Sequence, residues 1–194
     1  YGRTLSVVDR DGNSVWQKSF GGTYEAHGTY AGNLRGDGVE ALLVGGTFNE
    51  TQIRLDAVRL SDGATLWTFD DTTAHWSVHT IALEDVNRDG AKEVFIWTAG
   101  NQAYGRFPKY QALRGSDGTR LWQQAYPYNT SILTHARIAD VNGDGTKEVL
   151  LIVNNTIEAR DAMTGALVKT YTFGANLTTF ELAMVAPTNP PPAV

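Results

Sequence analysis

The sequence predicts an all-β protein, built from four-stranded antiparallel sheets that repeat about three and a half to four times. Two observations predict this class: short turn motifs recur along the chain between strand-forming residues, and no segment shows a sustained helical period. The chain has 194 residues, 42% hydrophobic and 19% charged, which suits a globular domain or a small array of repeats with a sizeable core.

The first repeated motif is a tight Asp-Gly turn that leads into a strand with a large apolar residue. It occurs in residues 9–17, 60–68, 115–123 and, with Thr-Gly in place of Asp-Gly, 162–170. Each copy predicts two short strands around a polar turn. We expect Trp16, Trp67 and Trp122 to fill equivalent packing positions between neighbouring sheets, with Val168 at that position in the last copy.

A second motif alternates with the first and carries an acidic loop between two strands. It occurs in residues 27–46, 79–98 and 135–153. Its second strands, Ala41–Val44, Val94–Trp97 and Val149–Val153, are apolar throughout, as expected of strands covered on both faces. One copy of each motif supplies four strands in about 50 residues, the size of a blade in a β-propeller.

The strand count defines the predicted domain. Residues 4–20 give a pair of strands, three full sets of four follow, and residues 177–185 offer one more strand. We therefore expect a propeller-like repeat domain over residues 1–186 and a proline-rich tail or linker over 187–194. If the last strand pairs with the first two, a four-bladed ring can close; otherwise unpaired strand edges remain available to another chain.

Both motifs resemble known propeller repeats. The D-G-x-x-L-W motif resembles the repeat of pyrroloquinoline-quinone-type propellers, and the D-V-N-x-D-G-x-K-E-V motif, at 85–94 and 140–149, resembles the FG-GAP or VCBS repeat. The latter occurs in integrin α-subunit propellers, in bacterial and archaeal surface proteins and in some polysaccharide lyases. The resemblance covers most of residues 4–173 and implies the fold far more strongly than a function.

The two complete acidic loops predict calcium sites. Counted from Asp85 or Asp140, side-chain oxygens stand at the first, third, fifth and ninth positions of each loop, and the backbone carbonyl of the seventh residue could join them. A ligand set made only of oxygen atoms favours Ca²⁺. The predicted ligands are Asp85, Asn87, Asp89, the Ala91 carbonyl and Glu93 in one loop, and Asp140, Asn142, Asp144, the Thr146 carbonyl and Glu148 in the other. An EF-hand is excluded, because apolar Ile96 and Leu151 stand where it requires an acid. Two Asx-rich turns without metal remain the alternative.

The corresponding loop at 33–40 departs from this pattern. Arg35 stands at the third position and Glu40 comes one residue early, so we expect no calcium there and expect the guanidinium to replace the cation. The Arg-Gly-Asp tripeptide at 35–37 is interpreted as part of this loop rather than as an adhesion motif.

Three histidines, His27, His79 and His135, recur just before the strand that leads into each acidic loop. A shared structural task is one interpretation, and a histidine cluster near the propeller axis for metal or substrate is the other. The sequence contains no nucleophile elbow, zinc-protease motif, phosphate loop or dinucleotide fingerprint, so we expect no enzymatic activity.

Charge and hydropathy exclude further partners. With 16 basic and 21 acidic residues the net charge is -5, which gives no electrostatic basis for binding nucleic acid. No apolar stretch approaches the ~18 residues of a membrane span, and the first residues do not resemble a secretion leader. The chain is therefore expected to be either cytosolic or a processed mature form, and its lack of cysteine fits either compartment.

Weak calcium sites, in the range of roughly 0.1 to 1 mM, favour an extracellular or cell-surface location. We expect a calcium-stabilised structural or adhesive protein, a self-assembling surface or filament subunit, whose partners are other copies or a cell-surface glycan or protein. A fragment of a carbohydrate-active lyase and a closed glycan- or protein-binding module are the alternatives. Glycan acceptor sequences at Asn49, Asn129, Asn154 and Asn176 agree with a secreted protein.

Overall fold

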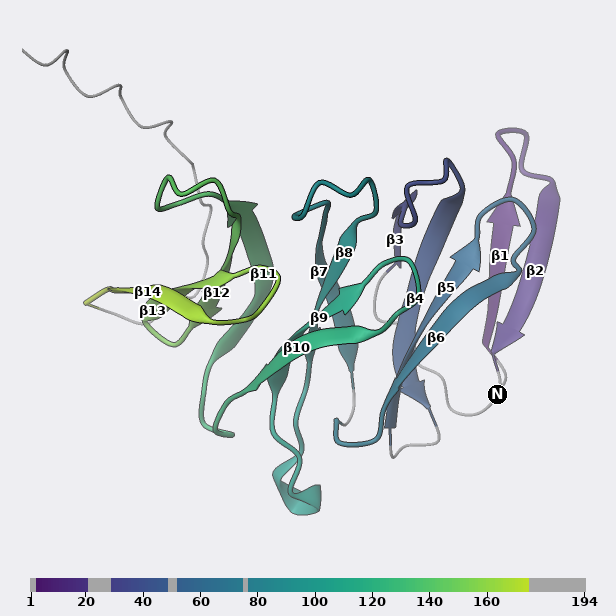
Figure 1. Cartoon of the computed structure of the whole chain (residues 1–194). Coiled ribbons are helices and arrows are strands. Elements are labelled where there is room, and N and C mark those ends of the chain that lie inside the picture. Colours follow the sequence, from purple (N-terminus) through teal and green to yellow (C-terminus); the bar gives the residue numbers. More distant parts are fainter. Residues whose placement is uncertain (1–2, 21–28, 49–51, 75–76, 175–194) are drawn as a thin grey trace, which may run out of the picture.

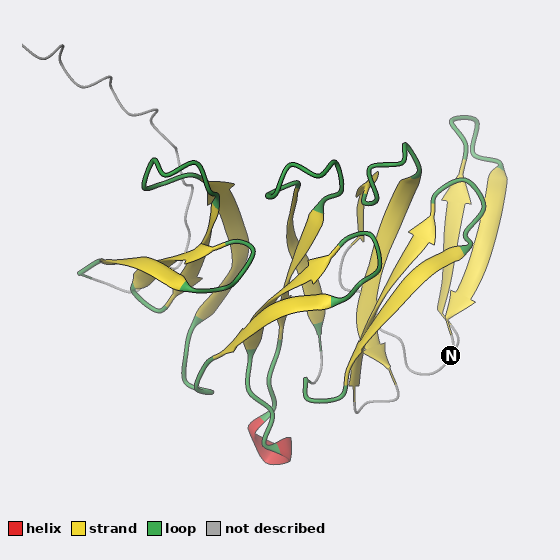
Figure 2. Cartoon of the chain, viewed as in Figure 1, coloured by secondary structure: helices red, strands yellow, loops and turns green. Residues whose placement is uncertain are grey.

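The computed structural model describes residues 3–20, 29–48, 52–74 and 77–174. Within these ranges the chain folds into strands β1–β14 and one 3₁₀ turn, η1, which is the red element of Figure 2. The all-β class predicted from the turn motifs is therefore confirmed. The predicted strand at 177–185, the domain end at 186 and the tail at 187–194 lie outside the described residues.

The strands form one two-stranded and three four-stranded antiparallel sheets, each hydrogen-bonded in chain order. The half-blade contains β1 (Arg3–Val8) and β2 (Ser14–Phe20). Blade 1 contains β3 (Thr29–Asn33), β4 (Glu40–Phe48), β5 (Gln52–Arg59) and β6 (Thr65–Asp71). Blade 2 contains β7 (Val78–Glu84), β8 (Glu93–Thr98), β9 (Lys109–Arg114) and β10 (Arg120–Ala125), with η1 (Gln102–Tyr104) between β8 and β9. Blade 3 contains β11 (Ile132–Ala139), β12 (Glu148–Val153), β13 (Thr156–Asp161) and β14 (Leu167–Thr172).

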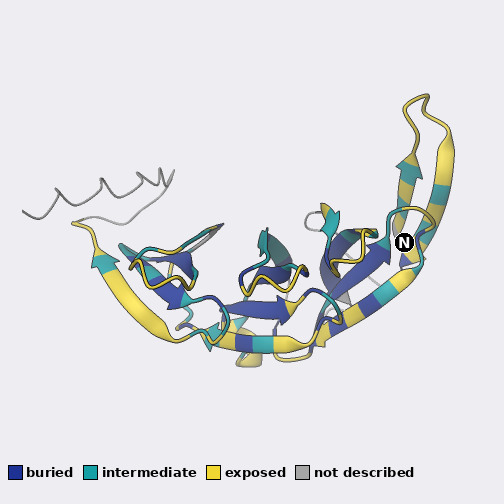
Figure 3. Cartoon of the chain, turned by 45° about the horizontal axis from the view of Figure 1, so that its top comes forward, coloured by how far each residue is buried: buried dark blue, intermediate teal, exposed yellow. Residues whose placement is uncertain are grey.

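The sheets stand side by side in chain order (Figure 1), and the described part of the chain forms an open arc (Figure 3). The half-blade is at one end of the arc and blade 3 at the other. The fourth strands β6, β10 and β14 run along the convex rim of the arc (Figure 3), and the second strands β8 and β12 are formed largely of buried residues. This is the expected array of about three and a half blades.

Apolar side chains from facing sheets form the cores between blades. Leu43 and Leu55 of blade 1 cluster with Val94 and Ile96 of blade 2, and all four are at most 1% exposed. A second core joins blades 2 and 3 in the same way. The apolar second strands are thus covered on both faces, as their sequence predicted.

One tryptophan in each of three sheets locks that sheet to the next. The indole Nε1 atoms of Trp16, Trp67 and Trp122 donate hydrogen bonds to backbone carbonyls of the next blade at 2.7, 2.7 and 2.9 Å. These three predicted positions between sheets are therefore confirmed. The acceptors are Leu60, Gly115 and Ala162, each three residues before the turn glycine of the next blade.

The prediction for the last copy was wrong by one residue. Lys169, not Val168, is paired with Ala159, as Trp67 is paired with Ala57 and Trp122 with Ala112. Val168 lies at the register shift between these pairs, because Ala159 is paired with Lys169 and Arg160 with Leu167. Blade 3 therefore carries an ammonium group where the other sheets carry an indole.

Candidate functional site

Three acidic loops lie at the same edge of the arc, each joining the first and second strands of a blade (Figure 2). Their backbones bend alike, because the fourth and sixth positions have positive φ angles in every loop. The angles are 72° and 80° at Gly36 and Gly38, 64° and 90° at Arg88 and Gly90, and 79° and 89° at Gly143 and Gly145. Glycine adopts this conformation without strain, whereas Arg88 does so against the preference of its side chain.

In blade 2 the loop side chains fold back onto the loop backbone. The Asp85 carboxylate accepts hydrogen bonds from the amides of Asp89 at 3.2 Å and Gly90 at 3.0 Å. Asp89 accepts from the Ala91 amide at 2.8 Å and from the Asn87 side-chain amide at 2.9 Å. The first, third and fifth predicted ligands thus surround one tight turn.

The loop of blade 3 repeats this arrangement. Asp140 accepts hydrogen bonds from the amides of two following glycines at 2.6 and 2.9 Å. Asp144 accepts from the Asn142 side chain at 2.8 Å and from both the amide and the hydroxyl of Thr146. The hydroxyl bond from Thr146 is the main cause that holds the pKa of Asp144 below its usual value. Two loops far apart in sequence therefore present equivalent sets of oxygen atoms.

A buried glutamate closes each of these two loops. Glu93 is 1% exposed and Glu148 is 0% exposed, and they accept hydrogen bonds from the amides of Val86 and Val141 at 3.1 and 2.8 Å. Burial raises the pKa of Glu93, and the nearby carboxylates of its loop raise it further. The Glu148 Oε1 atom is buried and has no hydrogen-bond partner among the residues that the structure describes.

An unpaired buried carboxylate oxygen is costly, and a bound cation removes that cost. The donor set, all oxygen, suits Ca²⁺, so these residues fit the predicted ion in chemistry. Within the described residues, however, no three His, Asp or Glu side chains already converge as a metal cage. Calcium at these two loops therefore stays a prediction, and in the structure the carboxylates bond to backbone amides.

The blade 1 loop lacks the buried glutamate. Ala41 is paired with Arg59 as Glu93 is paired with Arg114, so a methyl group takes the place of the ninth-position carboxylate. Glu40, one residue earlier, is exposed. Arg35 Nε lies 3.3 Å from Asp37 Oδ2, and both side chains are exposed, so replacement of a cation by this guanidinium stays a prediction.

Contacts between neighbouring loops were not predicted from the sequence. Lys147 of blade 3 donates to Glu84 Oε1 at 2.5 Å and to the Asp85 carbonyl at 3.3 Å. The Lys92 amide of blade 2 donates to the Leu34 carbonyl of blade 1 at 3.1 Å. The loops thus form a continuous edge across the blades.

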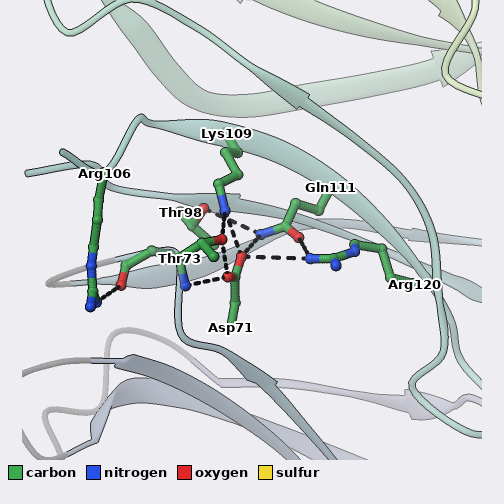
Figure 4. Close-up of polar contacts among 8 residues, drawn as sticks. Asp71, Thr73, Thr98, Arg106, Lys109, Gln111 and Arg120 are labelled. Atoms are coloured by element: carbon green, nitrogen blue, oxygen red, sulfur yellow. Dashed lines mark hydrogen bonds and ion pairs between the residues drawn. The ribbon is translucent and has the colours of Figure 1, made fainter.

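A buried polar cluster joins blades 1 and 2, and sequence reasoning missed it (Figure 4). The Asp71 carboxylate, whose side chain is 2% exposed, accepts from Lys109 Nζ at 2.9 Å, from Gln111 Nε2 at 3.1 Å and from the Thr73 amide at 2.8 Å. Burial by itself raises the pKa of Asp71, but the hydrogen bonds from Thr73 and Lys109 together hold it below the usual value. Arg120 lies at the solvent side of this cluster, 3.8 Å from Asp71.

Blades 2 and 3 have a different polar contact at the corresponding place. The Tyr126 hydroxyl donates to Glu158 Oε2 at 2.6 Å, and Arg160 Nε donates to the same oxygen at 2.8 Å. The interfaces between blades 1 and 2 and between blades 2 and 3 therefore share the tryptophan hydrogen bond but differ in their polar side chains. This difference distinguishes one interface from the other.

The histidine cluster remains untested. His79 lies in β7 with its ring 5.3 Å from that of Trp97, centroid to centroid. His27 and the side chain of His135 lie outside the described residues. Because only the His79 side chain is described, the distances among the three histidines are not defined, and both interpretations stay open.

Two of the four glycan acceptor sites are described. Asn129 is exposed in a turn closed by a hydrogen bond from the Thr130 amide to the Pro127 carbonyl at 3.0 Å. The Asn154 side-chain oxygen accepts from the Ser131 amide at 2.7 Å. Asn49 and Asn176 lie outside the described residues. None of the helices in the described ranges has the length and apolar character needed to cross a membrane.

The sequence matches no family model and no curated protein. The structure is similar to BamB from Moraxella catarrhalis, with a TM-score of 0.54, 20% identity, and coverage of 87% of this chain and 43% of that one. It is similar to the quinohemoprotein alcohol dehydrogenase of Comamonas testosteroni, with a TM-score of 0.58, 13% identity, and coverage of 88% and 32%. A rhamnogalacturonan lyase of Bacillus licheniformis gives a TM-score of 0.58 and 16% identity, with coverage of 88% and 38%.

These likenesses show the fold alone. Together with the blade array, they define the chain as a β-propeller-type protein. The chain spans less than half the length of these solved structures.

Proposed function

We propose that this chain is a calcium-stabilised structural or adhesive β-propeller element, extracellular or at the cell surface, without an enzymatic task. The observation that carries the proposal is the buried Glu148 carboxylate beside the loop of Asp140, Asn142 and Asp144. Its Oε1 atom has no hydrogen-bond partner within the described part of the chain. A divalent cation there would satisfy this oxygen and neutralise the clustered carboxylates.

Calcium at the two loops would act on stability rather than on a reaction. Each loop joins the first two strands of its own blade, so an ion that binds only the folded loop stabilises that blade by mass action. For sites of roughly 0.1 to 1 mM affinity, 10 mM Ca²⁺ adds about 1.4 to 2.7 kcal/mol per site. Such sites fill where free calcium is high, which favours the outside of the cell.

The test is chemical denaturation of the protein in 10 mM Ca²⁺ and after chelation. We expect calcium to raise the free energy of unfolding of the natural protein, and Glu148→Gln to remove about half of that gain because one of two sites is lost. Glu40→Gln is the matched control, since Glu40 is the exposed glutamate of the loop that lacks the buried acid. Equal calcium stabilisation of Glu148→Gln and the natural protein would contradict the proposal, as would no stabilisation of either.

A second candidate is a fragment of a polysaccharide lyase. The likeness to the rhamnogalacturonan lyase favours it at the level of the fold. In that case the chain would cleave acidic polysaccharide, and His79→Ala would lower the release of unsaturated sugar measured by ultraviolet absorbance. If the full-length protein releases none, the lyase candidate is rejected.

A further inference from the structure

At every interface between described sheets, an indole bonds to a backbone carbonyl of the next sheet, the contact called the tryptophan lock. In each lock the indole also lies against the turn glycine of that next sheet. A methyl group on Gly63, Gly118 or Gly165 would come within 2.7 Å of the indole of the preceding sheet. The fourth turn of this kind contains Gly12 in the half-blade, and a methyl group there would meet nothing within 4 Å. The Gly12 turn is therefore a receiving position that holds no side chain from the described residues.

The Gly12 turn is also built differently. The Asp9 amide bonds to the Asn13 carbonyl, whereas the Arg59 amide bonds to the Ala64 carbonyl, so the turn of the half-blade is one residue shorter. In blade 1 the Gly63 amide bonds to the Arg59 carbonyl, and the Leu60 carbonyl accepts the indole hydrogen bond of Trp16. In the shorter turn the carbonyl three residues before the glycine, that of Asp9, accepts from the Gly12 amide at 3.1 Å instead.

The charge of the Gly12 turn differs as well. In blades 1 and 2 the turn neutralises itself by an ion pair, Arg59 with Asp62 at 2.8 Å and Arg114 with Asp117 at 3.2 Å. The turn at 9–12 contains two carboxylates and one guanidinium, with Asp11 70% exposed. It therefore presents one negative charge in excess.

The opposite end of the arc carries the complementary change. Lys169 occupies the tryptophan position of β14 and is exposed, with its ammonium 5.0 Å from the centre of the Tyr171 ring. Its neighbours Leu167 and Val168 are 53% and 42% exposed. The last blade thus offers a cation where the others offer an indole, and the Gly12 turn offers an anion where the others offer a carbonyl.

We propose that Lys169 of one copy docks on the turn at residues 9–12 of a second copy. The proposal deepens the self-assembling form of the proposed function and rests on it. Relative to the tryptophan lock, one end of the arc replaces the indole with a cation and the other end presents a negative turn. We expect Lys169 to approach that turn as the tryptophans approach the turns of the following blades. The two ends lie at opposite ends of the open arc (Figure 3), so this contact joins two copies. Such a head-to-tail contact forms a ring or a filament, according to the rotation per copy.

The test is charge reversal with sedimentation of the full chain over a range of concentrations. We expect Lys169→Glu and Asp11→Lys each to weaken self-association by about tenfold or more, because each places like charges in contact. An equimolar mixture of the two variants is expected to associate again, since every contact in an alternating assembly then joins opposite charges. Gln102→Lys is the control: it adds a charge to the exposed η1 turn, away from both ends, and should leave association unchanged.

Three results would overturn the proposal: a natural protein that stays monomeric at every concentration, single reversals without effect, or a mixture that stays as weak as its components. Unchanged denaturation curves for the variants would show that they fold. Calcium stabilisation is measured separately on the same samples, so failure of the docking contact and failure of the calcium proposal give different results. Weakening of association at high salt is expected as well, because exposed charges are screened.

Discussion

Substitution of Gly118 by alanine tests the tryptophan lock directly. Gly118 has a φ angle of 75°, and a methyl group there would lie 2.7 Å from the Trp67 ring. The left-handed backbone costs a non-glycine residue about 1 to 2 kcal/mol. Overpacking against the indole adds about 1 to 3 kcal/mol. We therefore expect Gly118→Ala to lower the free energy of unfolding by about 2 to 5 kcal/mol.

Gly12→Ala is the matched control, because Gly12 has a φ angle of 85° and open space around the added methyl group. It should cost only the backbone part, about 1 to 2 kcal/mol. Urea denaturation of both variants gives the difference, which isolates the contact with the indole. When Trp67 is also replaced by alanine, Gly118→Ala should cost no more than Gly12→Ala. Equal losses for the two single variants would refute the lock as the reason for glycine in these turns.

Two further predictions concern the buried aspartate and the glycan sites. Lys109→Met leaves the buried Asp71 carboxylate without its closest cation, with only Arg120 at 3.8 Å remaining, so we expect a loss of about 3 to 5 kcal/mol in urea denaturation. The loss should be smaller when Asp71→Asn is added. Because the pKa of Asp71 is lower in the folded state than in the unfolded state, its carboxylate stabilises the fold above the unfolded pKa, and this stabilisation is lost as pH falls below about 4. Asp71→Asn should therefore reduce the fall in the free energy of unfolding at acid pH. An unchanged fall would exclude a stabilising role for the Asp71 carboxylate. The protein can be produced in a host that glycosylates secreted proteins, and its glycans located by peptide mapping. We expect glycan on Asn129, which is exposed in a turn, in preference to Asn154, whose side-chain oxygen accepts a hydrogen bond from the Ser131 amide. Higher occupancy at Asn154 than at Asn129 would contradict this prediction.

The fold was predictable because its signals are local and repeated. Each turn glycine, each tryptophan and each apolar second strand can be identified within a few residues of sequence, and the repetition fixes their order. The single misplacement, Val168 for Lys169, came from seeking an apolar residue where the strand carries a lysine. Counting from Gly165 as one counts from Gly63 identifies the correct position.

The polar contacts between blades were not predictable in this way. Asp71 and Lys109 are far apart in the chain and belong to different motifs, so no local pattern relates them. The same holds for Lys147 and Glu84. In the acidic loops, by contrast, the spacing of oxygen-bearing residues located the loop correctly, and the burial of Glu93 and Glu148 follows from their place at the start of an inner strand.

The direction of the tryptophan lock bears on how such a chain can lengthen. The indoles of Trp16, Trp67 and Trp122 each bond to the blade that follows, so a blade inserted with its own turn and its own tryptophan receives one lock and supplies the next. Duplication of blade 1 or blade 2 therefore leaves every interface with an indole and a glycine, whereas a second copy of blade 3 would meet Lys169 instead of an indole. A cut elsewhere in the unit separates an indole from its glycine, so the viable lengths of the protein differ by whole blades.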